Sequence, residues 1–333
     1  MPDVLVRETI FDSKAEQELF HELDSRLNPR LRLMAQTPLR SLIELDAATR
    51  QALKERHRRY FLQAVVDYTF VYPDGRPLLS IEFDGIGGGF SRGRQYIPCR
   101  KTGDPRREWK LTFKLRAAAR AHYPLFVISA DELEHLDEGG ALMIVDGIVG
   151  QIFSRVEERR IIDELLESDA ELLAKMDRGQ AHEHVQDLVL QAGVIADLEF
   201  DELAIATARE QQRCHERFGF GFGGFGSPWL YDPPLPADVE MTAEGIGRRR
   251  AAMEAADRVG ALVGVAAGNG EYICATAWMR NVGQDHGLIP ELVAEQVAEY
   301  LAIRRAIRLA EEGRVAECTE PAPFDRPNRL AAH

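Results

Sequence analysis

The alternation of hydrophobic and polar positions predicts a mixture of helices and strands in the first half of the chain. Apolar residues at helical spacing predict a helix over residues 13–27, and a charged segment predicts another over 47–60. The stretch between them runs through Pro29 and Pro38 and is predicted to be rich in loops. These elements open the predicted N-terminal domain.

A β-hairpin is the clearest local prediction in the sequence. Apolar residues fill 64–72 and 77–83, and Asp74-Gly75 stands between the two runs. Asp-Gly between apolar runs is a strong hairpin pattern, because both residues tolerate the backbone angles of a tight turn. We therefore expect two antiparallel strands joined by a two-residue turn, or by a four-residue loop closed by Tyr72 and Pro77, which gives the same register.

The elements after the hairpin complete a recognisable order. A glycine-rich loop over 85–93 is followed by a predicted helix over 107–122, a buried strand over 124–129 and a helical turn over 131–136. Helix, strand, strand, helix and strand in succession suit a small mixed sheet with helices on its faces.

The second half of the chain is predicted to be mainly helical, with a small β element. Its expected helices cover 157–176, 185–216, 245–260 and 290–312, and its expected strands cover 261–266 and 272–280. A long irregular loop rich in Gly and Phe is expected over 219–236. The predicted domains are therefore 1–155, 156–318 and a loose tail over 319–333.

Composition narrows the class of protein. The chain has 333 residues and a formal net charge of −13, so its overall field does not favour nucleic acid, and any such contact needs a local basic patch. Four cysteines without a C-x-x-C pair favour reduced thiols, and hence the cytoplasm. The sequence has no signal-peptide pattern and no membrane-spanning apolar run, so no membrane partner is expected.

Three carboxylates are predicted to converge at one end of the hairpin. Side chains alternate between the faces of a strand, and the expected turn places Asp67 directly opposite Glu82, with Asp84 on the same face. Opposed like charges are destabilising, so the cluster calls for a compensating cation. Mg²⁺ or Mn²⁺ bound by these oxygens is the natural candidate, whereas a solvated sheet edge is the alternative, which is favoured for Asp84 taken alone.

A local basic patch follows the carboxylates. Arg92 and Arg94 follow the glycine loop, and Lys110 and Lys114 stack on one side of the predicted helix. A solvated helix face is the usual meaning of a charge run. The order of carboxylates, glycine loop, arginines and lysine pair nevertheless fits a site for a phosphodiester, with Arg92 and Arg94 holding the backbone.

These residues resemble a known group of enzymes. The pattern consists of Glu16 in the first helix, Asp67 in "VDYTF", Glu82 and Asp84 in "IEFDG", and Lys114 before "YPLFVIS". It resembles the PD-(D/E)XK (restriction-endonuclease-like) nuclease superfamily, in particular the branch of very-short-patch-repair-type endonucleases. The resemblance covers about residues 10–135 and implies a core of one helix, a three-strand meander, a second helix and a further strand.

The resemblance also implies roles for individual residues. Asp67 and Glu82 are expected to hold the metal, and Asp84 to act as a further ligand directly or through water. The family's lysine two residues after the second acid is replaced here by Asp84. Lys114 is the expected substitute, with Lys110 as the second choice. The family often has a His after Asp-Gly, whereas glycines and Phe stand here, so proton transfer by His is not expected.

The sequence leaves several functions open. The leading hypothesis is a Mg²⁺-dependent endonuclease, a hydrolase that binds nucleic acid, most plausibly DNA, in repair, mobile-element or phage-defence processes. The alternative is an inactive nuclease fold that serves as a binding or scaffolding module. A third hypothesis gives the main role to the C-terminal half, and the oligomeric state is left open between a homodimer and a complex with a partner protein.

Overall fold

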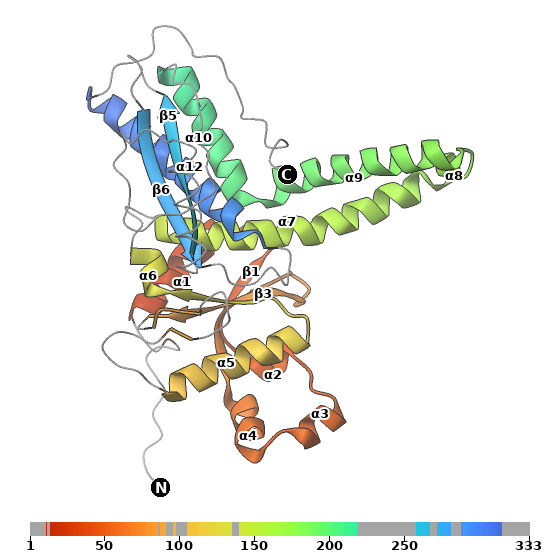
Figure 1. Ribbon diagram of the computed structural model, residues 1–333, viewed down its shortest axis with the longest axis vertical. Coiled ribbons are helices and arrows are strands. Elements are labelled where there is room, and N and C mark those ends of the chain that lie inside the picture. The colour runs from red at the N-terminus through yellow and green to blue at the C-terminus, as the bar shows by residue number, and fades with distance from the viewer. Residues whose placement is uncertain are drawn as a thin grey trace, which may run out of the picture. The chain divides into compact units, whose positions relative to one another are not determined.

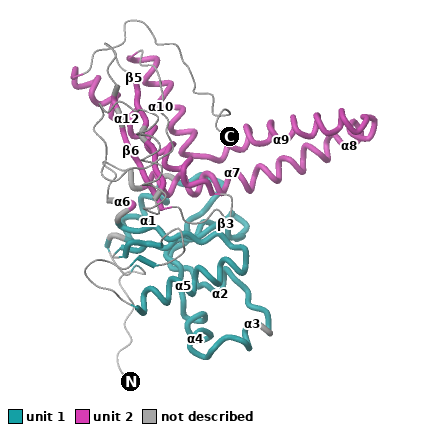
Figure 2. The backbone as a smooth tube through the Cα atoms, viewed as in Figure 1, with its two compact units in different colours: residues 1–131 teal, residues 132–333 magenta. Residues whose placement is uncertain are grey.

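The computed structural model describes residues 11, 14–85, 87–90, 96–97, 105–134, 140–218, 258–266, 272–280 and 288–314. The chain divides into two compact units, residues 1–131 and residues 132–333 (Figure 2). The predicted boundary at residue 155 falls inside a long helix of the second unit, Gly140–Ser168, so the division comes earlier in the chain than the composition indicates.

Unit 1 is a mixed α/β unit built on a four-stranded sheet. Its elements in chain order are α1 (Lys14–Arg26), β1 (Arg32–Pro38), α2 (Leu39–Leu42), α3 (Ala47–Ala52), α4 (Glu55–Gln63), β2 (Val65–Val71), β3 (Pro77–Asp84), α5 (Pro105–Arg120) and β4 (Leu125–Ser129). The strand order is β1-β2-β3-β4, in which β1 to β3 are antiparallel and β4 is parallel to β3. The parallel pair requires a crossover connection, and α5 supplies it along one face of the sheet (Figure 1).

Strand β1 corrects the loop predicted through Pro29 and Pro38. It pairs with β2 from Arg32 opposite Val71 to Pro38 opposite Val65. Pro38 is tolerated because it ends an edge strand. The strand is short and carries polar residues, which is why the sequence pattern did not separate it from a loop.

The β2–β3 turn also differs from the prediction. Gly75 donates its backbone N–H to the carbonyl of Tyr72 at 2.9 Å, and Tyr72 donates to Arg76 at 2.8 Å, so three residues form the loop. Gly75 has a φ of +89°, a left-handed conformation that glycine adopts without strain. The register then shifts between Phe70 and Val71. This bulge cancels the extra loop residue and restores the predicted register farther from the turn.

The segment between β1 and β2 packs against the back of α5. The predicted helix over 47–60 is two helices, α3 and α4, because the chain is extended at Leu53, the C-cap of α3, and at Lys54. Leu39, Phe61 and Ala118 belong to the resulting core cluster. The cluster fixes α5 against the sheet, so α5 can present side chains to the sheet face at defined positions.

Unit 2 is mainly helical, with a two-stranded ribbon. Its elements are α7 (Gly140–Ser168), α8 (Ala170–Leu173), α9 (Arg178–Phe200), α10 (Glu202–Phe218), β5 (Arg258–Ala266), β6 (Tyr272–Arg280) and α12 (Pro290–Glu311), and α6 (Ala130–Glu134) runs across the unit boundary. Helices α7 and α9 pack together, and α12 packs against β5, β6 and α10 (Figure 1). Asp201 breaks the predicted helix over 185–216 and accepts a hydrogen bond from Ala204 at the start of α10.

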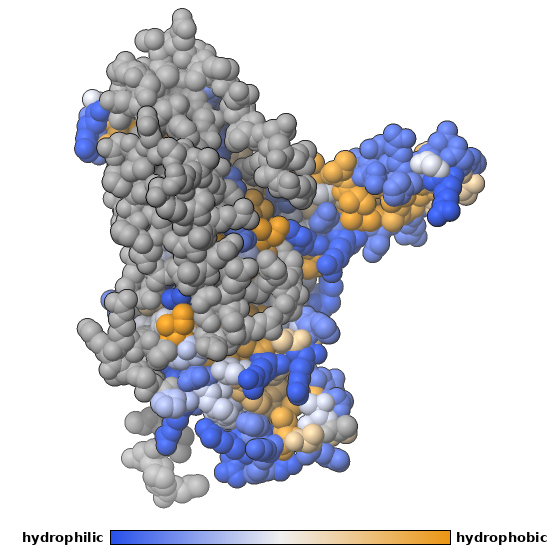
Figure 3. Space-filling model, in the orientation of Figure 1, coloured by the Kyte–Doolittle hydropathy of each residue, from blue (hydrophilic) through white to orange (hydrophobic). Residues whose placement is uncertain are grey.

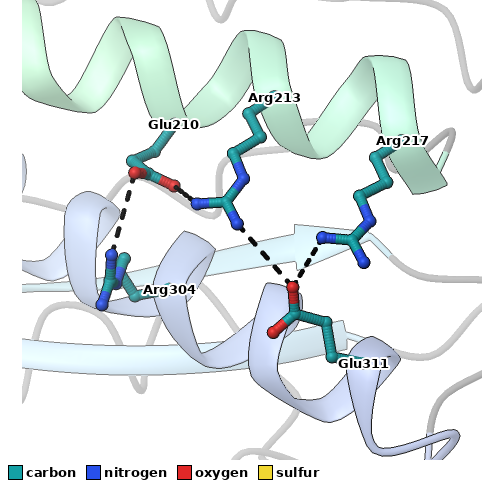
Figure 4. Close-up of polar contacts among 5 residues, drawn as sticks. All are labelled: Glu210, Arg213, Arg217, Arg304 and Glu311. Carbon is teal, nitrogen blue, oxygen red and sulfur yellow. Dashed lines mark hydrogen bonds and ion pairs between the residues drawn. The ribbon is translucent and has the colours of Figure 1, made fainter.

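The α10–α12 contact combines an apolar core with an ion-pair network. Glu311 pairs with Arg217 at 2.6 Å and with Arg213 at 3.7 Å, and Glu210 pairs with Arg213 at 3.4 Å and Arg304 at 3.8 Å (Figure 4). These side chains are partly exposed, so each pair contributes at most about 1 kcal/mol. Most of the stabilisation therefore comes from the buried residues beneath, which include Cys214, Ile303 and Ala306.

Helix α9 carries apolar residues on two opposite faces. Its buried face packs inward through Leu188 and Ala192, whereas Leu190 and Leu198 are each 68 % exposed and Val194 is 59 % exposed. The three exposed residues recur every fourth position and so form one stripe. Figure 3 shows apolar side chains along the arm that α7 and α9 form. These side chains stay in contact with solvent and lie outside the core of unit 2.

Other predictions about unit 2 have mixed outcomes. Strand β5 begins at Arg258, so the end of the helix predicted over 245–260 is wrong, and the rest of it lies outside the described residues. The predicted loop over 219–236 and the tail over 319–333 also lie outside them. Strand β6 and helix α12 confirm the predicted strand over 272–280 and helix over 290–312. None of the described helices is long and apolar enough to cross a membrane.

Candidate active site

The three carboxylates singled out in the sequence lie on one face of the unit 1 sheet. Tyr68 pairs with Ile81 and Thr69 with Ser80, and the same register continued by one residue places Asp67 opposite Glu82. Because side chains alternate, Asp67 and Glu82 share the face of Thr69 and Ser80, whose hydroxyl groups are hydrogen-bonded at 2.9 Å. The pairing of the two carboxylates thus agrees with the sequence prediction although the turn does not.

Glu82 and Lys114 of α5 form a buried hydrogen-bonded pair, which is an ion pair when Glu82 is ionised. The Lys114 Nζ atom donates to Glu82 Oε1 at 2.6 Å, and the two residues are only 8 % and 4 % exposed. Burial raises the pKa of Glu82 to about 8, the Lys114 ammonium opposes this rise, and the charge of Asp67 adds to it. A carboxyl group with a pKa this high exchanges protons near neutral pH, which is uncommon outside functional sites.

Asp84 is fully buried and held by a second cation. Arg107 Nε donates to Asp84 Oδ1 at 2.7 Å, and the Gly87 N–H donates to the same oxygen at 3.1 Å. A Cβ atom at Gly87 would lie 1.8 Å from Asp84 Oδ2 and 2.2 Å from the Tyr96 hydroxyl, so only glycine fits there. Burial and the nearby Asp84 carboxylate raise the pKa of Tyr96. Asp84 therefore anchors the start of the glycine loop.

Asp67 is oriented by the neighbouring strands. The Phe83 N–H donates to Asp67 Oδ2 at 2.9 Å. On the other side, the β1–β2 register places Gln36 opposite Asp67, and Gln36 has a φ of +50°, a left-handed conformation uncommon for a non-glycine residue. Backbone strain of this kind tends to gather at functional sites.

Two tyrosines feel the negative charge of the carboxylates. Burial, followed by the negative charges of Glu82 and Asp67, raises the pKa of Tyr60 from α4. Tyr68 lies on the opposite face of β2 and donates its hydroxyl to the main-chain carbonyl of Glu16 at 3.0 Å. Both tyrosines are therefore neutral at physiological pH, and Tyr68 acts as a hydrogen-bond donor.

The predicted site residues fall into three groups. Asp67, Glu82, Asp84 and Lys114 lie on the α5 side of the sheet, but Asp84 is buried and paired with Arg107, so the solvated sheet edge considered for it is wrong. Lys110 is exposed, and Glu16 in α1 is joined to the sheet through Tyr68, on the face opposite the carboxylates. Arg92 and Arg94 lie outside the described residues.

Sequence reasoning missed the role of Arg107. It belonged to a run of basic residues that resembled a solvated helix face. Arg107 and Lys114 are seven residues apart and so share one side of α5, which is the pattern that could have identified the pair. Tyr60 gave no such pattern, because only the tertiary packing of α4 brings it near the carboxylates.

Two carboxylates, those of Asp67 and Glu82, are the protein ligands available for a metal ion at this site. Within the described parts of the chain, no three His, Cys, Asp or Glu residues are grouped so that they could hold a metal ion. Asp67 and Glu82 supply a pair of carboxylates, and Mg²⁺ is commonly held by one or two carboxylates together with water and substrate phosphate. Lys114 and Arg107 already compensate the charges of Glu82 and Asp84, so the compensating cation inferred from the sequence is in part provided by the protein itself.

Comparisons with protein-family models, with curated proteins and with solved structures find no match for this chain.

Proposed function

We propose that this chain is a metal-dependent nuclease of the PD-(D/E)XK type, which hydrolyses phosphodiester bonds of DNA at the unit 1 carboxylates. The observation that carries the proposal is the buried Lys114–Glu82 ion pair beside Asp67 on a single sheet face. Isolated buried charges are costly, and such perturbed groups gather at sites of catalysis more often than elsewhere.

The order of elements in unit 1 supports the proposal. A helix, α1, precedes the antiparallel meander β1 to β3, and α5 then leads to β4, which lies parallel beside β3. Apart from α2, α3 and α4, which lie between β1 and β2, this is the element order that the resemblance implies. The acidic residues also occupy the expected strands, Asp67 on β2 and Glu82 on β3.

The residues divide the proposed chemistry between them. Asp67 and Glu82 would hold the metal, which when bound supplies a Lewis acid for the phosphate and a water of lowered pKa. Lys114 lies within hydrogen-bonding distance of Glu82 and would stabilise the negative charge that develops on the phosphate. Lys114 thus stands in for the lysine that Asp84 replaces. Arg107 keeps Asp84 and the glycine loop in place.

A non-catalytic role is the second candidate. The internal pairing of Glu82 with Lys114 and of Asp84 with Arg107 favours it, because a structural ion-pair network also perturbs pKa values. In that case the unit would use the same fold to bind or to scaffold, without hydrolysis.

A panel of substrates separates the two candidates. Purified protein is incubated with plasmid, linear duplex DNA, single-stranded DNA and RNA, in Mg²⁺, in Mn²⁺ and in EDTA. The nuclease is expected to cleave DNA with a metal ion present and to stop in EDTA. Asp67→Asn, purified identically, is the control for contaminating nucleases, since it keeps the shape of the side chain and removes its charge. Cleavage that persists in Asp67→Asn would place the activity elsewhere, and no cleavage of any substrate would favour the scaffold.

A further inference from the structure

Unit 1 contains a cavity of about 320 Å³ that the proposed reaction does not use. It lies between α5 and the segment that runs from the end of α2 through α3 to the start of α4. The residues that line it include Asp46, His57, Trp109, Phe113, Arg116, Ala117 and Arg120. Its volume is at the lower end of the range of small-molecule sites, about 300–1,000 Å³.

Aromatic rings make one wall of the cavity, and they are fixed in place. The His57 ring stacks on Trp109 and on Phe113, with centroids 5.5 Å apart in both pairs. The Trp109 indole N–H donates to His57 Nε2 at 3.3 Å, and the Arg56 guanidinium lies 4.0 Å from the centre of the Trp109 ring. A wall held by these contacts needs little rearrangement to receive a flat apolar group.

Arginines with unused donors lie on the rim. Arg116 and Arg120 are one helical turn apart and exposed, and neither makes a hydrogen bond or ion pair in the described structure. Asp46 lines the same cavity, but its two oxygens accept from the Thr49 N–H at 2.8 Å and the Thr49 hydroxyl at 2.7 Å. Glu44 is the other carboxylate on the rim, and within the described residues it forms no ion pair with either arginine.

We propose that this cavity binds one nucleotide unit of a nucleic-acid strand, with the base against the aromatic wall and the phosphate at Arg116 and Arg120. Guanidinium groups bind phosphate through two parallel hydrogen bonds, and nucleic-acid bases stack on aromatic side chains. The inference rests on the proposed nuclease function for its choice of ligand. Helix α5 carries both sites on nearly opposite sides, since Lys114 faces the carboxylates and Arg116, two residues later, faces the cavity, so a strand bound at both sites passes around this helix.

The test measures binding of small probes by calorimetry in EDTA, where no cleavage occurs. The probes are deoxyadenosine monophosphate, deoxyadenosine without phosphate, and inorganic phosphate. The variant Arg116→Ala/Arg120→Ala is expected to weaken the monophosphate at least about tenfold and to leave deoxyadenosine unchanged. The matched control, Arg32→Ala/Arg59→Ala, removes the same charge from exposed arginines outside the cavity and is expected to change binding less than about twofold.

A second variant tests the apolar wall. Ala117→Trp fills the cavity and is expected to abolish binding of both deoxyadenosine and its monophosphate, with thermal unfolding as the check on folding. The inference is overturned if wild-type protein does not bind the monophosphate, if the arginine variant binds it as well as wild type, or if inorganic phosphate binds equally tightly. Cleavage is assayed separately, so a nucleotide site in a protein that does not cleave DNA refutes the proposed function and not the site.

Discussion

Metal binding at Asp67 and Glu82 is expected to depend steeply on pH, because a proton must leave Glu82 first. Burial raises the pKa of Glu82 to about 8 in the metal-free protein. If only the ionised carboxylate binds, the apparent affinity scales with its ionised fraction. Between about pH 6.5 and pH 8.5 that fraction, and therefore the Mn²⁺ affinity, is expected to rise about 25-fold.

Calorimetry of Mn²⁺ binding in buffers of different ionisation enthalpy measures directly how many protons are released per bound ion. About one proton per bound Mn²⁺ is expected to leave at about pH 6.5, and about a quarter of a proton at about pH 8.5. Glu82→Gln is the control, and its residual Mn²⁺ binding is expected to be weak and nearly independent of pH. The reasoning fails if the wild-type affinity is flat over this range, or if the variant shows the same rise.

The same pKa fixes the sign of a stability effect. Glu82 binds its proton more tightly in the folded chain than in the unfolded one, where the ordinary value is 4.5. The protonated Glu82 side chain therefore stabilises the fold fully below its pKa in the unfolded chain. This contribution to the free energy of unfolding is lost as the pH rises through about 8. Urea unfolding without metal is expected to show Glu82→Gln gaining stability relative to wild type over this range. If the difference in free energy of unfolding between the two proteins does not change with pH, the assignment is contradicted.

Further predictions concern Lys114 and the packing of unit 2. Lys114→Ala is expected to lower single-turnover cleavage at saturating Mn²⁺ about 10²- to 10³-fold, whereas exposed Lys110→Ala is expected to do much less; equal losses would contradict the assignment. Gly150→Ala is expected to cost about 1–3 kcal/mol of unfolding free energy, because its Cβ would lie 2.6 Å from Asp201 Oδ1. Gly193→Ala, whose Cβ would meet no atom closer than 3.4 Å, is expected to be neutral or to stabilise by up to about 1 kcal/mol. Urea denaturation of both variants decides this, and the reverse order of stabilities would contradict the packing.

Local rules predicted the centre of the site because it is set by strand geometry. The alternation of side chains placed Asp67 opposite Glu82, and the structure has the same register. Helical periodicity placed Lys114 on an element after the hairpin, and α5 presents it to Glu82. Such relations depend on a few neighbouring residues, so a sequence contains them directly.

The rest of unit 1 depends on contacts between distant segments. Strand β1 forms by pairing with the edge of β2, and the residues of Arg32–Pro38 do not by themselves indicate this pairing. In the sequence, Arg107 resembles a solvated charge, and only the structure shows that it pairs with the buried carboxylate of Asp84. The turn at Gly75 has one residue more than the predicted two-residue turn, and a bulge compensates for it. Here the register is set by the buried face of the sheet rather than by the turn.

In unit 2, the sequence located the helices but not all of their limits. The start of α7 at Gly140 lies within a short apolar run, and periodicity alone does not distinguish a buried helix from a buried strand there. The break at Asp201 depends on a buried hydrogen bond between its carboxylate and Gln296 of α12, which is distant in sequence. Tertiary packing therefore decides where these helices begin and end.

A crystal structure of the protein soaked in Mn²⁺ tests the central claim most directly. Anomalous scattering identifies the ion without reference to activity, and the proposed function predicts a peak bound by carboxylate oxygens of both Asp67 and Glu82, at about 2.0–2.2 Å, near the values of similar divalent ions. Lys114 is expected to have moved its ammonium group away from the oxygen that binds the ion. An Mn²⁺ peak elsewhere, or a Glu82–Lys114 ion pair unchanged at saturating Mn²⁺, would contradict the proposed active site.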